Sequence, residues 1–365
     1  MIIAAFLLQA LATADVDRVI TAGIQRGVYP GAVVVVGTRD TILYTRGFGH
    51  FTWSNAGAVP DPRTSLYDLA SLTKVVATTP AIMLLVERGL VNLGGRVSDY
   101  LPDFTGNGKD VVTVRHLLAH NSGLRAYLRL DTLARDAAGA RQVVMGEPLR
   151  WKPGAHVEYS DLNAMLLGWI VERVSGTSLD AFVSRELFGP LGLSETRFRP
   201  PPTTRSRVAP TGRWRGIPVA GMVNDQNAVR LGGVAGHAGL FGTGLEMARY
   251  AQFWLGNGIT RSGTRIFRPE TMAQFTARQA GSRALGWELR DSTTTNNWGH
   301  RMGSRTFGHT GFTGTSIWLD PDRGIFVVIL TNRVYAPRNT RSITRLKEIR
   351  GQVADAAVAL EEESR

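Results

Sequence analysis

The chain has 365 residues, of which 43% are hydrophobic and 20% charged, a balance typical of a folded globular protein and not of a disordered, collagen-like or coiled-coil chain. The absence of cysteine excludes disulfides, cysteine nucleophiles, thiolate zinc sites and iron–sulfur clusters. The net charge is +12, but the cations are nearly all arginines spread along the chain, and the densest stretch, residues 205–215, contains no recognised binding module, so we expect no nucleic-acid partner.

The first residues form a short apolar run, residues 2–11, followed by Ala12-Thr13-Ala14, a small-x-small pattern typical of a signal-peptide cleavage site. No Lys or Arg precedes Arg18, so the basic front of an export signal is missing. The run is also shorter than the roughly 20 residues that cross a bilayer, so we expect no stable membrane span. Two interpretations remain, an export signal and a hydrophobic N-terminal helix. The cleavage pattern favours export, which predicts a possible signal segment over residues 1–14 and a periplasmic or secreted protein.

Helical periodicity marks residues 15–27 and the closing segment from Ile343 to Leu360. Five β-rich runs lie at the two ends of the chain, at residues 31–37, 42–48, 284–290, 307–319 and 325–331. The middle of the chain is mostly helical. These patterns predict an α+β fold, in which an antiparallel five-stranded sheet is flanked by helices and carries an inserted, mostly helical lobe. The predicted sheet lobe is discontinuous, over residues 15–75 and 284–365, the helical lobe covers residues 76–283, and together they form one catalytic unit.

The clearest chemical pattern is the pair Ser71 and Lys74 at the start of a segment, residues 71–88, that is apolar nearly all round and therefore predicts a buried helix. Three residues apart, the two side chains lie on the same helix face. Burial and the positive helix end both disfavour a second positive charge, so we expect the pKa of Lys74 to be lowered and its amine to accept the Ser71 proton. The alternative interpretation is a helix-capping serine beside a lysine that extends to solvent.

Two further motifs follow in order along the chain. Tyr159-Ser160-Asp161 precedes a predicted helix, residues 162–174, and His309-Thr310-Gly311 lies in the strand-like run 307–319. Serine with lysine, then a tyrosine loop, then a strand triplet ending in Thr-Gly is the layout of one superfamily. The sequence therefore resembles the penicillin-recognising serine hydrolases, and within them the branch of class C β-lactamases, D-alanyl-D-alanine carboxypeptidases and esterases. Residues 67–74, 116–124 and 308–314 are similar to that branch as well, and the resemblance covers nearly all of the chain after residue 15.

The resemblance implies a role for each matching residue. Ser71 is the nucleophile that forms an acyl-enzyme, Lys74 shares its proton, and the Tyr159 hydroxyl relays protons for the leaving group and later for the deacylating water. The backbone N–H groups of Ser71 and Phe312 form an oxyanion hole. Thr310 and Gly311 bind substrate. Gly311 suits this role because a residue without a side chain lets the substrate lie against the strand. No cofactor is implied.

Two positions depart from the pattern of these enzymes. His309 replaces the usual lysine of the strand motif, which predicts weaker, pH-dependent binding of a substrate carboxylate around pH 6.5, with Arg333 as a compensating cation. Asp161 replaces the usual asparagine of the tyrosine motif, and an ionised aspartate does not donate to an amide carbonyl. Asp161 has a second interpretation, as the N-cap of the following helix. Both departures argue against strong β-lactam turnover and favour a peptidase or esterase.

Other candidate sites are weaker. His116 and His120 have the i, i+4 spacing of helix-borne metal ligands but lack a third ligand, so we interpret them as packing and loop-fixing residues and expect no metal. The glycine-rich residues 232–239 lack a phosphate-loop Gly-Lys and predict a rim loop of the cleft. The sequence thus predicts an enzyme that hydrolyses an amide, β-lactam or ester bond of a small-molecule or peptidoglycan-derived substrate. The alternative is a non-catalytic cell-envelope binding protein with the same fold.

Overall fold

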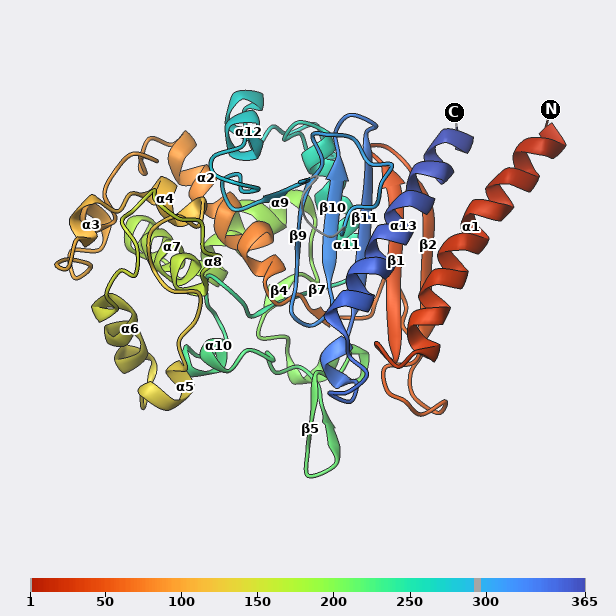
Figure 1. Ribbon diagram of the computed structural model, residues 1–365, viewed down its shortest axis with the longest axis horizontal. Coiled ribbons are helices and arrows are strands. Elements are labelled where there is room, and N and C mark those ends of the chain that lie inside the picture. The colour runs from red at the N-terminus through yellow and green to blue at the C-terminus, as the bar shows by residue number, and fades with distance from the viewer. Residues whose placement is uncertain (1, 292–296, 365) are drawn as a thin grey trace.

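A six-stranded antiparallel sheet organises the molecule, in the order β2-β1-β11-β10-β9-β8 (Figure 1). The structure is a computed structural model that describes residues 2–291 and 297–364. The sheet combines strands from both ends of the chain, as predicted: β1 (Gly31–Thr38), β2 (Ile42–Gly49), β8 (Glu288–Leu289), β9 (Phe307–Thr310), β10 (Ser316–Asp320) and β11 (Ile325–Thr331).

The prediction of five strands was wrong by one strand. The run 307–319 is not a single strand but a hairpin, in which β9 and β10 pair antiparallel with Ser316 opposite Thr310. The chain turns between them through Gly311 and Gly314, and Gly314 has a φ of 109°, a conformation that favours glycine. Polar and apolar residues alternate across this turn, so the hydrophobicity pattern alone does not reveal that the chain reverses direction here.

Strand β1 lies in the interior of the sheet, between β2 and β11, which explains its continuous run of valines. Val33 and Val35 face the larger core, whereas Val34 and Val36 face a second core on the opposite side of the sheet. Helices α1 (Ile2–Gln25) and α13 (Ile343–Ser364) pack together over the second core, and α11 (Gly244–Leu255) packs on the other face (Figure 1). The sheet is thus buried on both faces.

Helix α1 continues through the residues of the predicted cleavage site. From Ala12 onward its buried side chains, among them Val16 and Ile20, belong to the second core. The predicted helix at residues 15–27 is therefore the C-terminal part of a longer one. Among the described helices, none is long and apolar enough to cross a membrane. The signal segment and the export of the protein stay predictions.

The middle of the chain is mostly helical, with two small sheets. Its α-helices are α2 (Thr79–Glu87), α3 (Val97–Tyr100), α4 (Val114–Leu118), α5 (Leu130–Leu133), α6 (Ala137–Gly146), α7 (Asp161–Ser175), α8 (Leu179–Val183), α9 (Gly189–Leu191), α10 (Gln226–Arg230) and α12 (Pro269–Thr276). The remaining helical turns are η1 (Lys74–Thr78), η2 (Lys109–Val111), η3 (Ser184–Phe188), η4 (Pro202–Arg207) and η5 (Arg333–Tyr335). The small sheets are formed by β3 (Tyr67–Asp68), β7 (Leu240–Gly242) and β4 (Arg197–Phe198), and by β5 (Gly212–Trp214) and β6 (Ile217–Val219).

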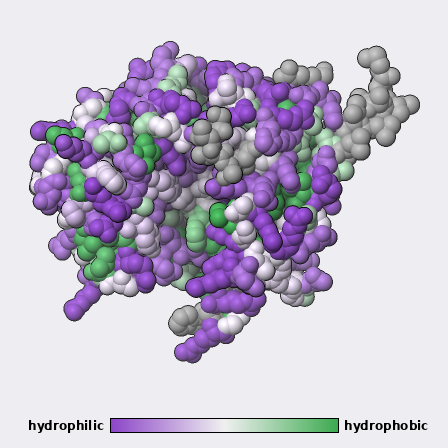
Figure 2. Space-filling view, in the orientation of Figure 1, coloured by the Kyte–Doolittle hydropathy of each residue, from purple (hydrophilic) through white to green (hydrophobic). Residues whose placement is uncertain are grey.

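One hydrophobic core links the sheet to the helical middle. It contains Val33 and Leu330 from the sheet together with Leu166 and Ile170 from α7. Figure 2 shows a mostly hydrophilic surface around these cores, with hydrophobic residues in separate groups. The lobe boundaries predicted from the sequence stay a prediction, but this shared core is the physical link between the two parts.

Candidate active site

Ser71 lies on a sharp turn between β3 and the buried helix. Ala70, directly before Ser71, has a φ of 48°. The Asp68 carboxylate accepts a hydrogen bond from the backbone N–H of Ala70 at 2.9 Å. The chain then enters the π-helical turn η1, which continues into α2 and begins at Lys74. The Lys74 Nζ donates to the Ser71 Oγ at 2.9 Å. The sequence prediction that these two side chains meet on one face is confirmed.

Lys74 is buried, with 3% of its surface exposed, and three acceptors surround its ammonium group. Besides Ser71, it contacts the Asp161 Oδ1 at 2.7 Å and donates to the backbone oxygen of His237 at 3.1 Å. Burial by itself lowers the pKa of Lys74, but the charges and hydrogen bonds of Asp161 and Tyr159 outweigh it, and the net pKa is raised. The expectation of a lowered pKa was therefore wrong, because the sequence did not show that a carboxylate pairs with this lysine.

Asp161 does not cap helix α7. The N-cap is Ser160, whose Oγ accepts the backbone N–H of Asn163 at 3.4 Å, and Asp161 is the first helical residue. This corrects the second interpretation of Asp161 and leaves its side chain free to pair with Lys74. A carboxylate at this position balances the buried ammonium, which an asparagine does not.

The Tyr159 ring lies at the centre of the site. The Lys74 Nζ is 4.9 Å from its centroid, and the rings of His120 and His309 lie 4.7 and 5.6 Å away. Burial raises the pKa of the Tyr159 hydroxyl, with Lys74 acting in the opposite direction. The tyrosine is thus protonated beside a protonated lysine, and the two groups titrate as a coupled pair.

His120 fixes the loop that carries Tyr159. Its Nδ1 accepts the backbone N–H of Ser160 at 3.1 Å, which requires a neutral ring. Burial, together with the charges of Arg283 and Lys74, lowers the pKa of His120 well below its usual value. His116 likewise accepts the Thr113 backbone N–H at 3.2 Å at the start of α4. Both contacts agree with the interpretation of these histidines as loop-fixing residues.

The opposite wall of the site is the hairpin β9–β10. Gly311 packs against the turn before Ser71, since an added Cβ would lie 2.1 Å from the Thr315 Oγ1 and 2.6 Å from the Leu69 oxygen. Glycine is therefore required here by the approach of two protein segments, a reason that the sequence analysis did not give. The backbone N–H groups of Ser71 and Phe312 donate to no other group within the described residues. They are available to bind a developing oxyanion, and this assignment stays a proposal.

With this geometry in place, comparisons with known proteins identify the family. The family model for β-lactamase matches residues 16–350. The chain belongs to the β-lactamase family. Among curated proteins, the chain is 31% identical over 360 residues to a "Putative D-alanyl-D-alanine carboxypeptidase" of Escherichia coli K12, covering 88% of this chain and 82% of that protein. A protein of the same description from Salmonella agona is 32% identical over 346 residues, with coverages of 85% and 80%.

Solved structures share the fold of this β-lactamase-family chain. EstCE1, described as a hydrolase with promiscuous acyltransferase activity, superposes with a TM-score of 0.77 at 22% identity, covering 95% of this chain and all of EstCE1. A class C β-lactamase gives a TM-score of 0.77 at 20% identity, with coverages of 95% and 96%. A penicillin-binding protein homologue from Caulobacter crescentus gives 0.77 at 20%, with coverages of 96% and 97%. These structures show the fold, and membership of the β-lactamase family together with the curated carboxypeptidase relatives shows that the chain is a serine hydrolase.

His309, which stands where the family pattern has lysine, is 2% exposed. Its Nδ1 lies 2.9 Å from the Thr310 carbonyl, which only accepts, so this nitrogen carries the proton and Nε2 is an acceptor. Burial first, and then the charges of Arg283 and Lys74, lower the pKa of His309 well below its usual value. The expected titration near pH 6.5 is therefore wrong, and His309 is neutral at physiological pH.

Arg333 does not line the cleft of the β-lactamase-family site. Its guanidinium lies behind the β9–β10 turn, where it donates to the Phe312 carbonyl at 2.6 Å and to the Arg341 carbonyl at 3.0 Å. The prediction that Arg333 compensates for His309 is not supported by this placement, because Arg333 does not line the cleft and its guanidinium is bound to two backbone carbonyls. Instead, Arg333 fixes the peptide between Phe312 and Thr313, which directly follows the peptide that carries the Phe312 N–H.

The cleft over Ser71 has a volume of about 660 Å³. Its lining combines the predicted residues Ser71, Tyr159, Asp161, His309, Thr310, Gly311 and Phe312 and the loop residues His237 and Ala238 with residues that the sequence analysis missed, namely Ala70, Tyr127, Asn224, Asp225, Gln226, Arg283, Glu288 and Ile343. His237 and Ala238 belong to the glycine-rich loop, which confirms its prediction as a rim loop. Phe312 is 63% exposed at the cleft edge.

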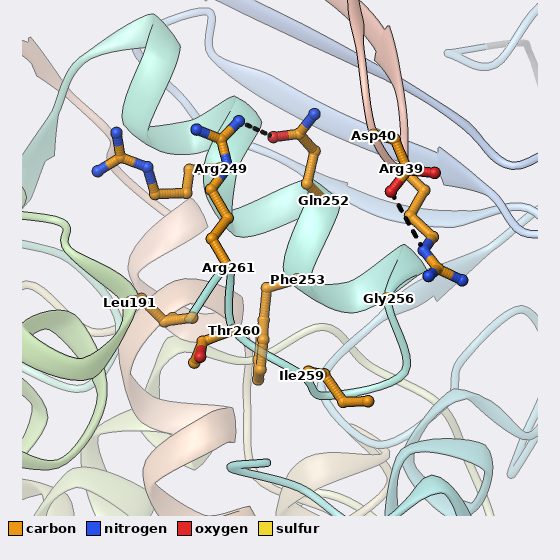
Figure 3. Close-up of a pocket in the computed structure, with 10 residues that line it drawn as sticks. All are labelled: Arg39, Asp40, Leu191, Arg249, Gln252, Phe253, Gly256, Ile259, Thr260 and Arg261. Atoms are coloured by element: carbon orange, nitrogen blue, oxygen red, sulfur yellow. Dashed lines mark hydrogen bonds and ion pairs between the residues drawn. The ribbon is translucent and has the colours of Figure 1, made fainter. Parts of the chain in front are cut away.

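Two other features do not extend the site. Asp161, Asp225 and His237 place three potential ligand atoms within 4.8 Å of one another, but Lys74 pairs with Asp161, and His237 lies 2.9 Å from Asp225. A second hollow of about 490 Å³ is shown in Figure 3, where Arg261 donates to Gln252 at 2.7 Å. None of the catalytic candidates lines this second hollow.

Proposed function

We propose that this protein is a cell-envelope acyl hydrolase of the D-alanyl-D-alanine carboxypeptidase type, which acts through an acyl-enzyme on Ser71. The observation that carries the proposal is the contact of 2.9 Å between the Ser71 Oγ and a Lys74 ammonium that Asp161 holds at 2.7 Å. Once it has lost its proton, Lys74 is a base beside the nucleophile, oriented by a third group, and this arrangement activates a serine.

In the proposed reaction, the Ser71 Oγ attacks the carbonyl carbon of the scissile bond. In the reactive form the Lys74 amine is neutral and accepts the serine proton. The Tyr159 hydroxyl gives its proton to the departing amine or alcohol and is reprotonated by Lys74. The backbone N–H groups of Ser71 and Phe312 bind the oxyanion, a contribution of about 3 kcal/mol for each donor. Water then attacks the acyl-enzyme, with the same pair of residues receiving its proton.

A peptide or ester substrate fits this site better than a β-lactam. His309 is neutral and Asp161 is committed to Lys74, so the site departs from the usual pattern of these enzymes at both positions. The names of the curated relatives from Escherichia coli and Salmonella support the same choice. The alternative of a non-catalytic binding protein is not favoured, because Ser71, Lys74 and Tyr159 are all present and in contact.

The test is hydrolysis of diacetyl-L-lysyl-D-alanyl-D-alanine, followed by release of D-alanine. The wild-type protein is expected to release D-alanine, and Ser71→Ala to lose at least 1,000-fold in kcat, as on removal of a nucleophile. Ser262→Ala, at an exposed serine outside the cleft, serves as the matched control and is expected to retain full activity. Undiminished release by Ser71→Ala would refute the proposed role of Ser71.

A further inference from the structure

Asp68 is a buried carboxylate on β3 that the proposed reaction does not use. It precedes Ser71 by three residues, and 2% of its surface is exposed. Its Oδ1 accepts the backbone N–H of Ala70 at 2.9 Å, and its Oδ2 accepts the backbone N–H of Asn224 at 2.7 Å. Ala70 belongs to the turn before Ser71, whereas Asn224 lines the cleft from a segment 156 residues further along the chain than Asp68. The carboxylate therefore joins two separate parts of the site.

On the side of the nucleophile, this link holds a strained turn. Ala70 has a φ of 48°, in the left-handed region that is unfavourable for a residue with a side chain. Its N–H donates to the Asp68 carboxylate, and the Asp68 carbonyl accepts the Thr313 hydroxyl at 2.7 Å from the turn of the hairpin β9–β10. These two contacts fix the direction in which the chain leaves the turn at Ser71.

On the side of the base, the link leads to Lys74. Asp225, the residue after Asn224, lies 2.9 Å from the His237 Nε2. The His237 carbonyl in turn accepts a hydrogen bond from the Lys74 Nζ at 3.1 Å. By holding Asn224, the Asp68 carboxylate fastens the segment that supports the position of Lys74.

The charge of Asp68 is kept at a cost. Burial raises the pKa of Asp68 to about 6, against the effect of the two N–H donors. Among the described residues no cation forms an ion pair with it, and the one charge that acts on it, that of Asp225, has the same sign. Because the pKa is raised in the folded state, ionisation of Asp68 lowers the free energy of unfolding as the pH rises through about 6. A buried charge without a stabilising counter-ion is typical of a functional site.

We propose that Asp68 is a positioning residue of the reaction, whose ionised carboxylate holds the Ser71 turn and the Asn224 segment together. An ionised carboxylate accepts at both oxygens, whereas a protonated carboxyl turns one oxygen into a donor and weakens one of the two hydrogen bonds. The inference rests on the proposed function, because it concerns the reactivity of Ser71. It adds a second ionisation to that of Lys74, and both must be in the correct form for activity.

The experiment compares the wild-type protein with Asp68→Asn, whose amide has the shape of the protonated carboxyl. Two rates are measured against pH, kcat/KM for p-nitrophenyl acetate and the labelling of Ser71 by a fluorophosphonate. Well above pH 6, the variant is expected to be about 10- to 100-fold slower in both, the range for a lost hydrogen bond to a charged group. As the pH falls through about 6, the ratio of wild-type to variant rate is expected to fall towards one, because the wild-type carboxyl then takes up a proton. Titration of Lys74 affects both proteins and cancels in this ratio.

The pH dependence separates a positioning role from a structural one. A ratio that stays constant with pH would mean that the substitution only distorts the fold, and a ratio of one at every pH would mean that Asp68 has no role; either result overturns the proposal. Asp320→Asn is the matched control. Asp320 is buried outside the cleft and accepts the backbone N–H groups of Gly303 and Asp322 at 2.6 and 2.9 Å, and its substitution is expected to leave both rates unchanged.

The wild-type protein alone provides a second test, which holds even if Asp68→Asn does not fold. The slope of log kcat/KM against pH is expected to steepen from about one towards two below about pH 6, because both Lys74 and Asp68 then take up protons. A slope that stays at one would overturn the proposal.

Labelling and peptide hydrolysis together separate this inference from the proposed function. Labelling of Ser71 that depends on Asp68, without hydrolysis of diacetyl-L-lysyl-D-alanyl-D-alanine by the wild-type protein, would refute the proposed function and sustain the inference. Hydrolysis of this peptide at a rate that Asp68→Asn does not change would do the reverse.

Discussion

At the scale of single residues, the motifs identified Ser71, Lys74, Tyr159 and Asp161, and the structure brings these four side chains together. What the sequence did not show was the pairing of Asp161 with Lys74, and with it the direction of the lysine pKa. Arg283 was also missed, because it belongs to no motif and reaches the cleft only through the fold. A motif reports which residues recur together, whereas a pKa depends on every charge that the tertiary structure places nearby.

The Asp161 carboxylate is predicted to set the acid limb of the pH–rate profile. Burial lowers the pKa of Lys74 and Asp161 raises it, so Asp161→Asn is expected to lower that pKa. If the neutral amine accepts the serine proton, activity rises with pH through the pKa of Lys74, and the acid limb of kcat/KM in Asp161→Asn moves to lower pH. The measurement is kcat/KM against pH for a neutral ester, with Asp103→Asn, at an exposed ion pair, as the control. A shift to higher pH would contradict the assigned sign.

At the scale of elements, the strands at both ends of the chain were predictable because alternating and β-branched residues mark them. The hairpin β9–β10 was not predictable, since only the five residues 311–315 separate its strands and the sequence pattern over residues 307–319 is that of one continuous strand. The small sheets of the helical middle were missed for a related reason: each strand has only two or three residues. The rim loop was predicted, but its close packing on α7 depends on contacts between distant segments.

That packing makes Gly236 a sensitive position. An added Cβ would lie 1.9 Å from the Ala164 carbonyl oxygen in α7, although the backbone conformation of Gly236 is not left-handed. Gly236→Ala is expected to destabilise the protein by about 3 kcal/mol, the upper part of the range for overpacking, and to lower kcat by displacing the His237 carbonyl from Lys74.

Urea unfolding and ester hydrolysis measure both effects of Gly236→Ala. Gly146→Ala, at a glycine of α6 with nothing within 4 Å of an added Cβ, is the matched control and is expected to stay within about 0.5 kcal/mol of wild type. Equal free energies of unfolding for the two variants would contradict this prediction and show that the loop accommodates the added Cβ.

At the scale of the whole molecule, the sheet built from both chain ends was predictable from the order of the elements, because the strands flank the helical middle on both sides. The number of units that unfold cooperatively could not be predicted from the sequence, since it depends on which side chains meet across the lobes. One core joins Val33 and Leu330 of the sheet to Leu166 of α7, and β1 faces the second core beneath α13. Elements that share a continuous core unfold together.

The two cores are therefore predicted to unfold in a single transition. Leu166→Ala in the first core and Leu346→Ala in the second are each expected to cost about 2 to 5 kcal/mol and to move the same transition midpoint. Urea unfolding followed in parallel by tryptophan fluorescence and far-ultraviolet circular dichroism measures this. Two separated transitions, each moved by only one of the substitutions, would show that the lobes are independent units.

The central claim is that Ser71 is a nucleophile activated by Lys74, and covalent labelling by a fluorophosphonate tests it most directly. Intact-mass spectrometry of the wild-type protein is predicted to show one adduct, which peptide mapping places on Ser71. Ser71→Ala is predicted to remain unlabelled, and Lys74→Ala to label at least 100-fold more slowly, since proton transfer to a positioned base contributes roughly that much. An unlabelled wild-type protein, or an adduct that persists in Ser71→Ala, would contradict the account.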